Sequence, residues 1–231
     1  MRQCDWWYDD MRQVGLDFSQ AAQVQTYDAR QGTDPTADAT LLRDLGLRPG
    51  QRMADIGCGT GSLVCEAARI GAEVYAIDVS DAMLAATESR AQALRRQGVV
   101  LQHGGFLSAE LPEASFDLIT SKAALHHLPD MWKAVALARI FAALKPGGRF
   151  YLRDVAFSCP VERLPAAVEA WAEWMVAETG YSREDVAGHV RDEFSTFGWI
   201  LEGLIEAAGF RLIRKRYAQE VYAEYIAERP H

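Results

Sequence analysis

Residues 55–61 read DIGCGTG, and this stretch decides the fold. It begins at the end of a short β-rich run at 52–56 that predicts a strand, and it precedes a helical stretch that runs to Ile70 and is stopped by Gly71. Glycines in a turn between a strand and a helix let the backbone approach a ligand closely, because no Cβ stands in the way. A dinucleotide fingerprint has a further glycine where this chain has Ser62. The turn therefore predicts a nucleotide-like ligand that lacks a pyrophosphate.

Short β-rich runs alternate with helical stretches from position 49 onward, which is the pattern of βαβ units on a parallel sheet. A final helix at 199–208 and two strands near 210–216 and 220–227 predict a closing antiparallel hairpin. The expected fold is α/β, with a Rossmann-like, seven-stranded, mostly parallel sheet, that hairpin, and a helical cap rich in aromatic residues. The other strands are expected at 52–56, 73–78, 99–103, 116–120 and 149–155, and helices are expected to end at 70, 96 and 144.

The chain divides by composition into four expected segments. They are a cap segment at 1–40, a core at 41–157, a helical cap insertion at 158–198, and a C-terminal helix and hairpin at 199–231 that complete the core. Five of the six tryptophans lie near the N-terminus or between 158 and 199, and Trp132 is the exception. We expect both aromatic segments to cover the ligand crevice at the carboxyl ends of the strands.

Composition and charge exclude several classes of partner. The formal net charge is −8 without a Lys/Arg-rich run, so we expect no nucleic-acid partner. Apolar runs are shorter than the roughly 20 residues that span a bilayer, and the N-terminus does not resemble a signal peptide. We therefore expect a cytoplasmic protein without a membrane partner. The four cysteines are scattered without histidines at metal-ligand spacing, so we expect no metal. A monomer and a homodimer are both open.

Asp78 ends the second expected strand, at the distance downstream where an acidic residue binds a ribose diol. Two carboxylate oxygens suit two neighbouring hydroxyl groups. Taken alone, the glycine-rich turn and this aspartate are also compatible with ordinary turn chemistry.

Five stretches together give a more specific prediction. In chain order, residues 55–61, 76–80, 116–119, 125–130 and 144–148 resemble the motifs of class I S-adenosylmethionine (SAM)-dependent methyltransferases that act on small molecules. The resemblance covers about residues 40–155. It implies SAM as cofactor and a small-molecule substrate that accepts the methyl group.

The resemblance also implies contacts to SAM. The glycines of the first turn pack against its methionine part, Asp55 orients its ammonium group, and Asp78 holds the ribose hydroxyls. Tyr27 resembles an aromatic that reaches the carboxylate, although a core tyrosine is the alternative. The expected cofactor-binding residues are Tyr27, Asp55, Gly57, Cys58, Gly59, Gly61, Asp78, Val79, Met83, Gly105, Phe106, Ser121, Lys122 and His126.

One departure from the family pattern affects the adenine. After the third strand the family usually shows Gly-Asp, and that carboxylate accepts a hydrogen bond from the adenine amino group. This chain has Gly104, Gly105 and Phe106 instead. The adenine contact must therefore differ, and Phe106 either stacks on the purine or belongs to the core.

Candidate catalytic residues are His126, His127 and Tyr181. A histidine near its ordinary pKa of about 6.5 can take a proton from an acceptor, although a structural role for the histidine pair is the alternative. The expected substrate pocket contains an acid at the end of the fifth strand and several cap aromatics. The aromatics alternatively form the small core of the cap itself. The pocket residues are Trp7, Tyr8, Asp154, Trp171, Trp174 and Tyr181.

Four functions are compatible with these motifs. The first is methyl transfer to nitrogen, oxygen, sulfur or carbon of a small molecule. The second is cyclisation of SAM with release of methylthioadenosine, because azetidine-2-carboxylate synthases are similar in general build. The third is a non-catalytic SAM-binding module. A nicotinamide-dependent dehydrogenase is the fourth, and both Ser62 and the 145–148 turn argue against it.

Overall fold

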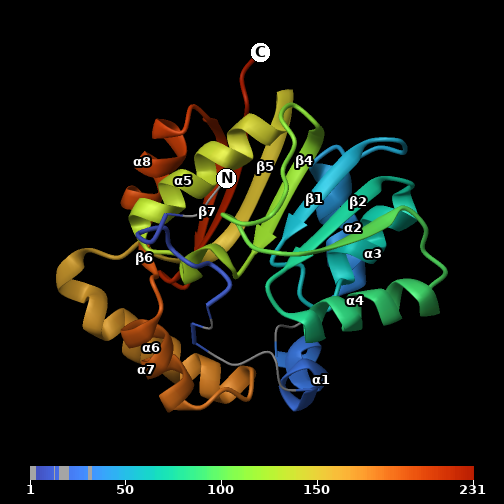
Figure 1. The fold of residues 1–231 in the computed structure, drawn as a ribbon. Helices are drawn as coiled ribbons and strands as arrows, with labels where there is room; N and C mark the ends of the chain where they lie inside the picture. The colour runs from blue at the N-terminus through green and yellow to red at the C-terminus, as the bar shows by residue number, and fades with distance from the viewer. Residues whose placement is uncertain (1–3, 13, 16–20, 31–32) are drawn as a thin grey trace.

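The structure is a computed structural model that describes the chain except residues 1–3, 13, 16–20 and 31–32. Part of the expected N-terminal cap falls on those residues. The described part forms one mixed sheet with helices on both faces and a helical cap at one end (Figure 1).

Seven strands form the sheet in the order β3-β2-β1-β4-β5-β8-β7, which confirms the predicted fold. β1 to β5 pair in parallel, and β8 pairs antiparallel with both β5 and β7. A two-residue strand that the sequence did not predict, β6, pairs with the end of β5. The bounds are β1 Arg52–Ile56, β2 Glu73–Asp78, β3 Val99–His103, β4 Phe116–Lys122, β5 Leu144–Phe157, β6 Thr196–Phe197, β7 Arg211–Ala218 and β8 Tyr222–Glu228.

The two faces of the sheet bury separate cores. Side chains alternate along a strand, so Met53 faces one core and Ala54 the other. One core contains residues of α2, α3 and α4, and the opposite core contains residues of α5 and α8 (Figure 1). The helices are α1 Ala21–Arg30, α2 Pro35–Asp44, α3 Ser62–Ile70, α4 Asp81–Ala93, α5 Asp130–Ala143, α6 Leu164–Glu178, α7 Arg183–Asp192 and α8 Gly198–Ala207.

Strand and helix boundaries differ from the predicted ones at several places, and two of the differences have a clear local cause. α4 ends at Ala93 rather than at 96, because Arg95 adopts a left-handed conformation with φ of 52°. The 145–148 turn does not separate a helix from a strand. It is a bulge inside β5, where the pairing with β4 moves from Leu144 to Arg149.

The cap lies at the carboxyl ends of the parallel strands, where α1, α6 and α7 come together (Figure 1). α6 and α7 share a third apolar cluster with the ends of β5 and β8. The guanidinium carbon of Arg30 in α1 lies 5.2 Å from the ring centre of Tyr181, which precedes α7. α1 is also tied to the core, because Asp28 accepts a hydrogen bond from Thr60 and pairs with Arg90.

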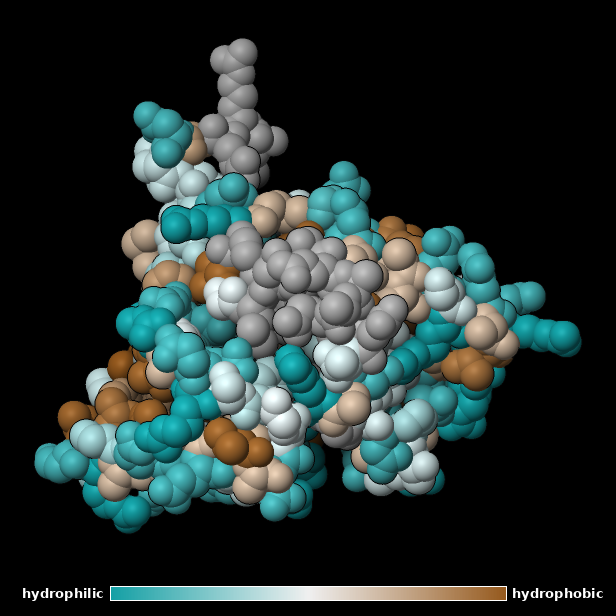
Figure 2. All heavy atoms as spheres, turned by 90° about the horizontal axis from the view of Figure 1, so that it is seen from below, coloured by the Kyte–Doolittle hydropathy of each residue, from teal (hydrophilic) through white to brown (hydrophobic). Residues whose placement is uncertain are grey.

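Figure 2 looks onto the cap end of the molecule and shows hydrophobic side chains in small groups among hydrophilic ones. Trp199 is the most exposed large hydrophobic residue of the 158–199 stretch, at 67%. Among the described helices, none has the length and apolar character that a membrane crossing requires.

Candidate functional site

The glycine-rich turn is built for close approach. Gly57, Gly59 and Gly61 have φ values of 77°, 55° and 78°, a region that glycine adopts without a steric penalty. A Cβ on Gly57 would lie 2.5 Å from the Cβ of Ala124. The turn is held in place because the amides of Gly57 and Cys58 donate to the Ile77 carbonyl at 2.8 and 3.0 Å.

Asp78 connects this turn to the start of α4. Its Oδ2 accepts a hydrogen bond from the Gly59 amide at 2.9 Å, and its Oδ1 accepts one from the Ser80 amide at 2.9 Å. Burial raises the pKa of Asp78 despite these amides. Each oxygen has a second lone pair for another donor, so the carboxylate has the acceptors that a diol requires.

Asp55 lies at the end of β1 next to β4. It is 3% exposed and accepts a hydrogen bond from the Thr120 hydroxyl at 2.6 Å. Burial raises its pKa to about 6, although the Thr120 hydrogen bond and the nearby Lys122 lower it. A cationic ligand group beside Asp55 would favour the ionised carboxylate further.

Two adjoining cavities lie on either side of the glycine-rich turn. The smaller has a volume of about 100 Å³ and the larger about 300 Å³. Four residues line both of them: Tyr27, Gly57, Ala123 and His127. A ligand that passes the turn would therefore extend from one cavity into the other.

The smaller cavity is a mostly apolar slot with an acid at one end. Its apolar walls include Val79, Met83 and Phe106, and Asp78 supplies the acid. Phe106 is 5% exposed and also packs in the core. Its position therefore fits both alternatives, stacking on a purine and a role in the core. The slot thus combines apolar walls with a carboxylate acceptor, and this combination suits a nucleoside.

The larger cavity begins at the glycine-rich turn and continues under the cap. On its core side Asp38 of α2 accepts hydrogen bonds from Ser62 at 2.6 Å and from Lys122 Nζ at 2.8 Å. On its cap side it is lined by Trp171, Trp174, Met175, Tyr181, Val186 and Tyr222. Trp171 Nε1 donates to the Tyr222 hydroxyl at 2.9 Å, which satisfies both polar groups within an aromatic wall.

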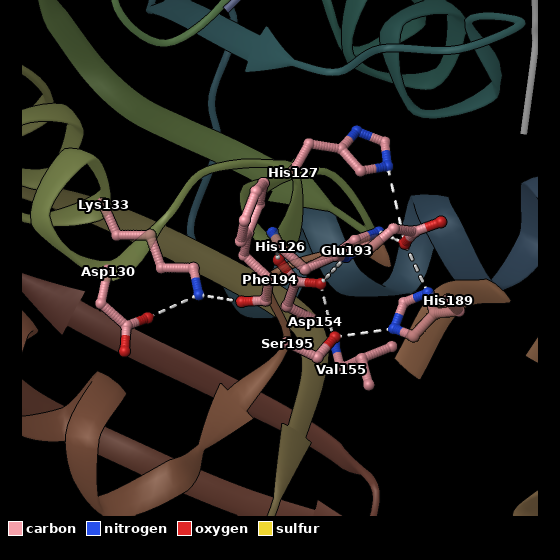
Figure 3. Close-up of polar contacts among 10 residues, drawn as sticks. All are labelled: His126, His127, Asp130, Lys133, Asp154, Val155, His189, Glu193, Phe194 and Ser195. Carbon is pink, nitrogen blue, oxygen red and sulfur yellow. Dashed lines mark hydrogen bonds and ion pairs between the residues drawn. The ribbon is translucent and has the colours of Figure 1, made fainter. Parts of the chain in front are cut away.

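A cluster of histidines and carboxylates forms the third wall of the larger cavity (Figure 3). The buried ring of His126 lies between Asp154, which contacts Nδ1, and Glu193, whose Oε2 lies 3.1 Å from Nε2. His189 Nδ1 lies 2.5 Å from the same Glu193 oxygen, and His127 Nε2 lies 3.9 Å from it. Asp154 also accepts a hydrogen bond from the His126 amide at 3.0 Å.

The cluster gives its two adjacent histidines opposite charge states. Burial would lower the pKa of His126, but the carboxylates of Asp154 and Glu193 outweigh it and raise that pKa to about 10. Burial and the neighbouring His126 imidazolium lower the pKa of His127 to about 4. At neutral pH His126 is therefore charged and His127 is neutral.

A buried lysine fixes the segment that carries Glu193. Lys133 of α5 is 2% exposed, and its Nζ pairs with Asp130 at 2.8 Å and donates to the Phe194 carbonyl (Figure 3). The Phe194 amide donates to the His126 carbonyl at 2.9 Å. These contacts hold Glu193 against His126, although the two residues are far apart in the sequence.

The structure brings most of the predicted site residues into these cavities. Asp55, Cys58, Lys122, His126, Asp154, Trp171, Trp174 and Tyr181 line the larger one, and Gly59, Asp78, Val79, Met83, Gly105 and Phe106 line the smaller one. Their roles toward SAM and the acceptor stay predictions.

Four of the predicted residues are not among the described residues that line either cavity: Trp7, Tyr8, Gly61 and Ser121. Trp7 packs edge-on against Trp132 with ring centres 4.9 Å apart, and the Tyr8 hydroxyl donates to the His127 carbonyl at 3.3 Å. Both rings therefore seat the N-terminal segment on α5. Ser121 is fully buried in β4.

Within the described part of the chain, His126, His127 and Glu193 present ligand atoms within 4.8 Å of one another, a spacing that a metal ion could use. Histidine spacing in the sequence did not reveal this group, because Glu193 joins it only through folding. Both ring nitrogens of His126 already face carboxylates, so a metal would have to displace a proton there.

Comparison with known proteins agrees with this geometry. A family model described as a methyltransferase domain matches residues 54–152. The 27-O-demethylrifamycin SV methyltransferase of Amycolatopsis mediterranei is 33% identical over an alignment of 156 residues, which covers 64% of this chain and 55% of that protein. This chain thus spans little more than half of that relative. An uncharacterized methyltransferase of Geobacillus kaustophilus is 32% identical over 170 residues, 74% of each chain.

A solved structure shows the same fold. Phosphoethanolamine N-methyltransferase 2 of Haemonchus contortus, in complex with phosphomonomethylethanolamine and S-adenosylhomocysteine, superposes with a TM-score of 0.70 at 18% identity. The superposition covers 91% of this chain and 58% of that one. The chain belongs to the class I SAM-dependent methyltransferases. It is therefore a SAM-dependent methyltransferase.

The sequence did not identify several residues of the site. Asp10, Asp38, His189 and Glu193 all line the cavities, and none lies in a recognised motif. The aspartates stand in segments before the first strand, and His189 and Glu193 lie in the cap insertion. No signal in a single sequence marks them, because their partners are distant along the chain.

Proposed function

We propose that the enzyme methylates a nitrogen or oxygen atom of a small molecule and that His127 accepts the proton which this atom loses. The observation that carries the proposal is the position of His127. It lines both cavities, next to the glycine-rich turn, and its imidazole is neutral at pH 7. A base at the junction of the donor and acceptor spaces is within reach of a reacting group.

The residues fit SAM as the donor. The slot beside Asp78 suits the adenosine, and the glycine-rich turn, which a Cβ would obstruct, suits the chain that leads from it to the larger cavity. Asp55 faces that cavity and suits an ammonium group. When bound, SAM supplies a methyl carbon activated by a sulfonium leaving group. The protein then has to align the acceptor and exclude water, and alignment can supply up to about 7–11 kcal/mol of the barrier.

His126 and Glu193 have a different role in this proposal. His126 is already protonated at neutral pH, so it cannot take a proton from the acceptor. Glu193 spans His126 and His189 and lies 3.9 Å from His127 Nε2. It is placed to stabilise the positive charge that His127 gains when it accepts a proton.

The larger cavity limits the acceptor in size and charge. Its volume of about 300 Å³ must also receive the methionine part of SAM, so the acceptor is small. Among the described lining residues, six carry carboxylates, three are lysine or arginine, and His126 is a fourth cation. This balance disfavours an anionic acceptor, and the aromatic wall can attract a cation. We therefore place amines before alcohols and phenols as candidates.

The test uses purified enzyme, SAM, and panels of small amines, alcohols and phenols, with release of S-adenosylhomocysteine as the readout. For the best acceptor, His127→Gln should lower kcat by about 10²- to 10⁴-fold with little change in KM. The exposed His231→Gln is the matched control and should behave as wild type. An unchanged kcat in His127→Gln would exclude this residue as the base.

SAM incubated alone belongs in the same experiment. Methylthioadenosine above the nonenzymatic rate would support the cyclising alternative in place of methyl transfer. The expectations that the protein binds neither nucleic acid nor membrane, is cytoplasmic, and is a monomer or homodimer stay predictions, and size-exclusion chromatography with light scattering checks the last.

A further inference from the structure

The N-terminal segment places a carboxylate in the smaller cavity. Among the described residues that line this cavity, two are acids, Asp78 and Asp10. Asp10 precedes the core and reaches the loop after β3, which is 97 positions away in the chain. There Asp10 Oδ2 accepts hydrogen bonds from the amides of Leu107 at 2.6 Å and Ser108 at 3.3 Å. The segment is thereby fixed to the loop that follows β3.

The second oxygen of this carboxylate lacks a donor. Asp10 Oδ1 is buried, and no polar atom of the described residues forms a hydrogen bond with it. A buried carboxylate oxygen without a donor is costly, because it has lost its water without a replacement. Since Asp10 lines the cavity, a ligand there can supply the missing donor.

Gly105 creates the space that Asp10 uses. A Cβ on Gly105 would lie 2.5 Å from Asp10 Oδ2 and 3.1 Å from Val79 Cγ1. A side chain at 105 and the Asp10 carboxylate therefore exclude each other. The carboxylate that fills this space comes from the N-terminal segment instead of from the end of β3.

We propose that Asp10 recognises the amino group of the adenine of SAM, with Oδ1 as the hydrogen-bond acceptor. The smaller cavity provides apolar walls for a purine and Asp78 for the ribose, and an exocyclic amino group is the donor that an adenine offers. The N-terminal segment is then part of the cofactor site. This assignment concerns SAM and does not depend on the role of His127.

Titration calorimetry with two ligands tests the proposal. S-adenosylhomocysteine carries the amino group, and S-inosylhomocysteine carries an oxygen acceptor in its place. Wild type should prefer the adenosyl ligand. In Asp10→Asn the amide oxygen is retained by the Leu107 and Ser108 amides, so its NH₂ group faces the base. Affinity for the adenosyl ligand should then fall about tenfold, and the preference should vanish or reverse in favour of the inosyl ligand.

The neighbouring Asp9 supplies a matched control. Asp9 is exposed and its carboxylate contacts the Met11 amide at 3.1 Å, so Asp9→Asn should keep the wild-type preference. A wild-type preference in Asp10→Asn would overturn the proposal. An equal loss for both ligands would also overturn it, because Asp10 would then only support the loop.

A rescue variant separates recognition from loop support. Gly105→Asp alone should weaken binding, because its side chain meets the Asp10 carboxylate. In Asp10→Ala the space is open, so Asp10→Ala/Gly105→Asp should bind S-adenosylhomocysteine more tightly than either single variant and regain the preference for the adenosyl ligand. Thermal unfolding of each variant confirms that it is folded. A double variant without the preference counts against the assignment.

Discussion

The His126 cluster makes stability depend on pH in a direction that can be calculated. The pKa of His126 is raised from about 6.5 in the unfolded chain to about 10 in the folded protein. Its contribution is therefore fully present below pH 6.5 and is lost as the pH rises through 10. Linkage gives about 4 kcal/mol at pH 7 and about 1–2 kcal/mol at pH 9, so the protein should lose about 2–3 kcal/mol from this group between these pH values.

The assay is urea unfolding at pH 7 and pH 9 for wild type and His126→Gln. The variant should be about 3–5 kcal/mol less stable at pH 7, because Asp154 and Glu193 lose the cation between them. At pH 9 the difference in stability should shrink by about 2–3 kcal/mol, since other titrating groups are common to both proteins. His231→Gln serves as control. If the stabilities of wild type and His126→Gln change in parallel between the two pH values, His126 is not a buried imidazolium with a raised pKa.

Three further changes test other parts of the site. Asp78→Asn should weaken S-adenosylhomocysteine binding by about 1–3 kcal/mol, and unchanged affinity in calorimetry would argue against the ribose contact. Gly57→Ala should lower the free energy of unfolding by about 1–3 kcal/mol, because φ is 77° and the new Cβ would lie 2.5 Å from another Cβ. Gly203→Ala in α8 meets nothing within 4 Å and should raise it by about 0.5–1 kcal/mol in the same urea titration; similar values for both glycines would refute the packing argument. Trp171→Phe removes the donor to Tyr222 and should cost about 1 kcal/mol in thermal unfolding, whereas an unchanged midpoint would show that this hydrogen bond contributes nothing.

The core of the fold could be read from the sequence because its signals are local. The glycine-rich turn, the strand ending at Asp78 and the turn at 145–148 each need a few consecutive residues of particular chemistry, so the pattern predicts them. The limits of such signals show at 145–148, where the glycines form a bulge inside β5 instead of a separate turn. Glycine marks an unusual conformation, but the pairing partner decides what that conformation becomes.

The sequence did not indicate which cap aromatics line the cavity and which pack elsewhere. Trp171 and Trp7 have the same chemistry and both lie in aromatic-rich segments, yet Trp171 lines the larger cavity and Trp7 packs against Trp132. Irregular segments have no periodicity that assigns one face to the ligand and another to the core.

By itself, the sequence determined the βαβ core, the cofactor turn and the acid at the end of β2, because neighbouring residues specify each of them. Only the tertiary structure decided that Asp10 fills the space left by Gly105, and that Glu193 sets the charges of His126 and His127. Both arrangements join residues more than 60 positions apart, and the path of the chain between them is fixed by packing that no local pattern records. The site is therefore assembled from one motif that is visible in the chain and from two distant segments that fold onto it.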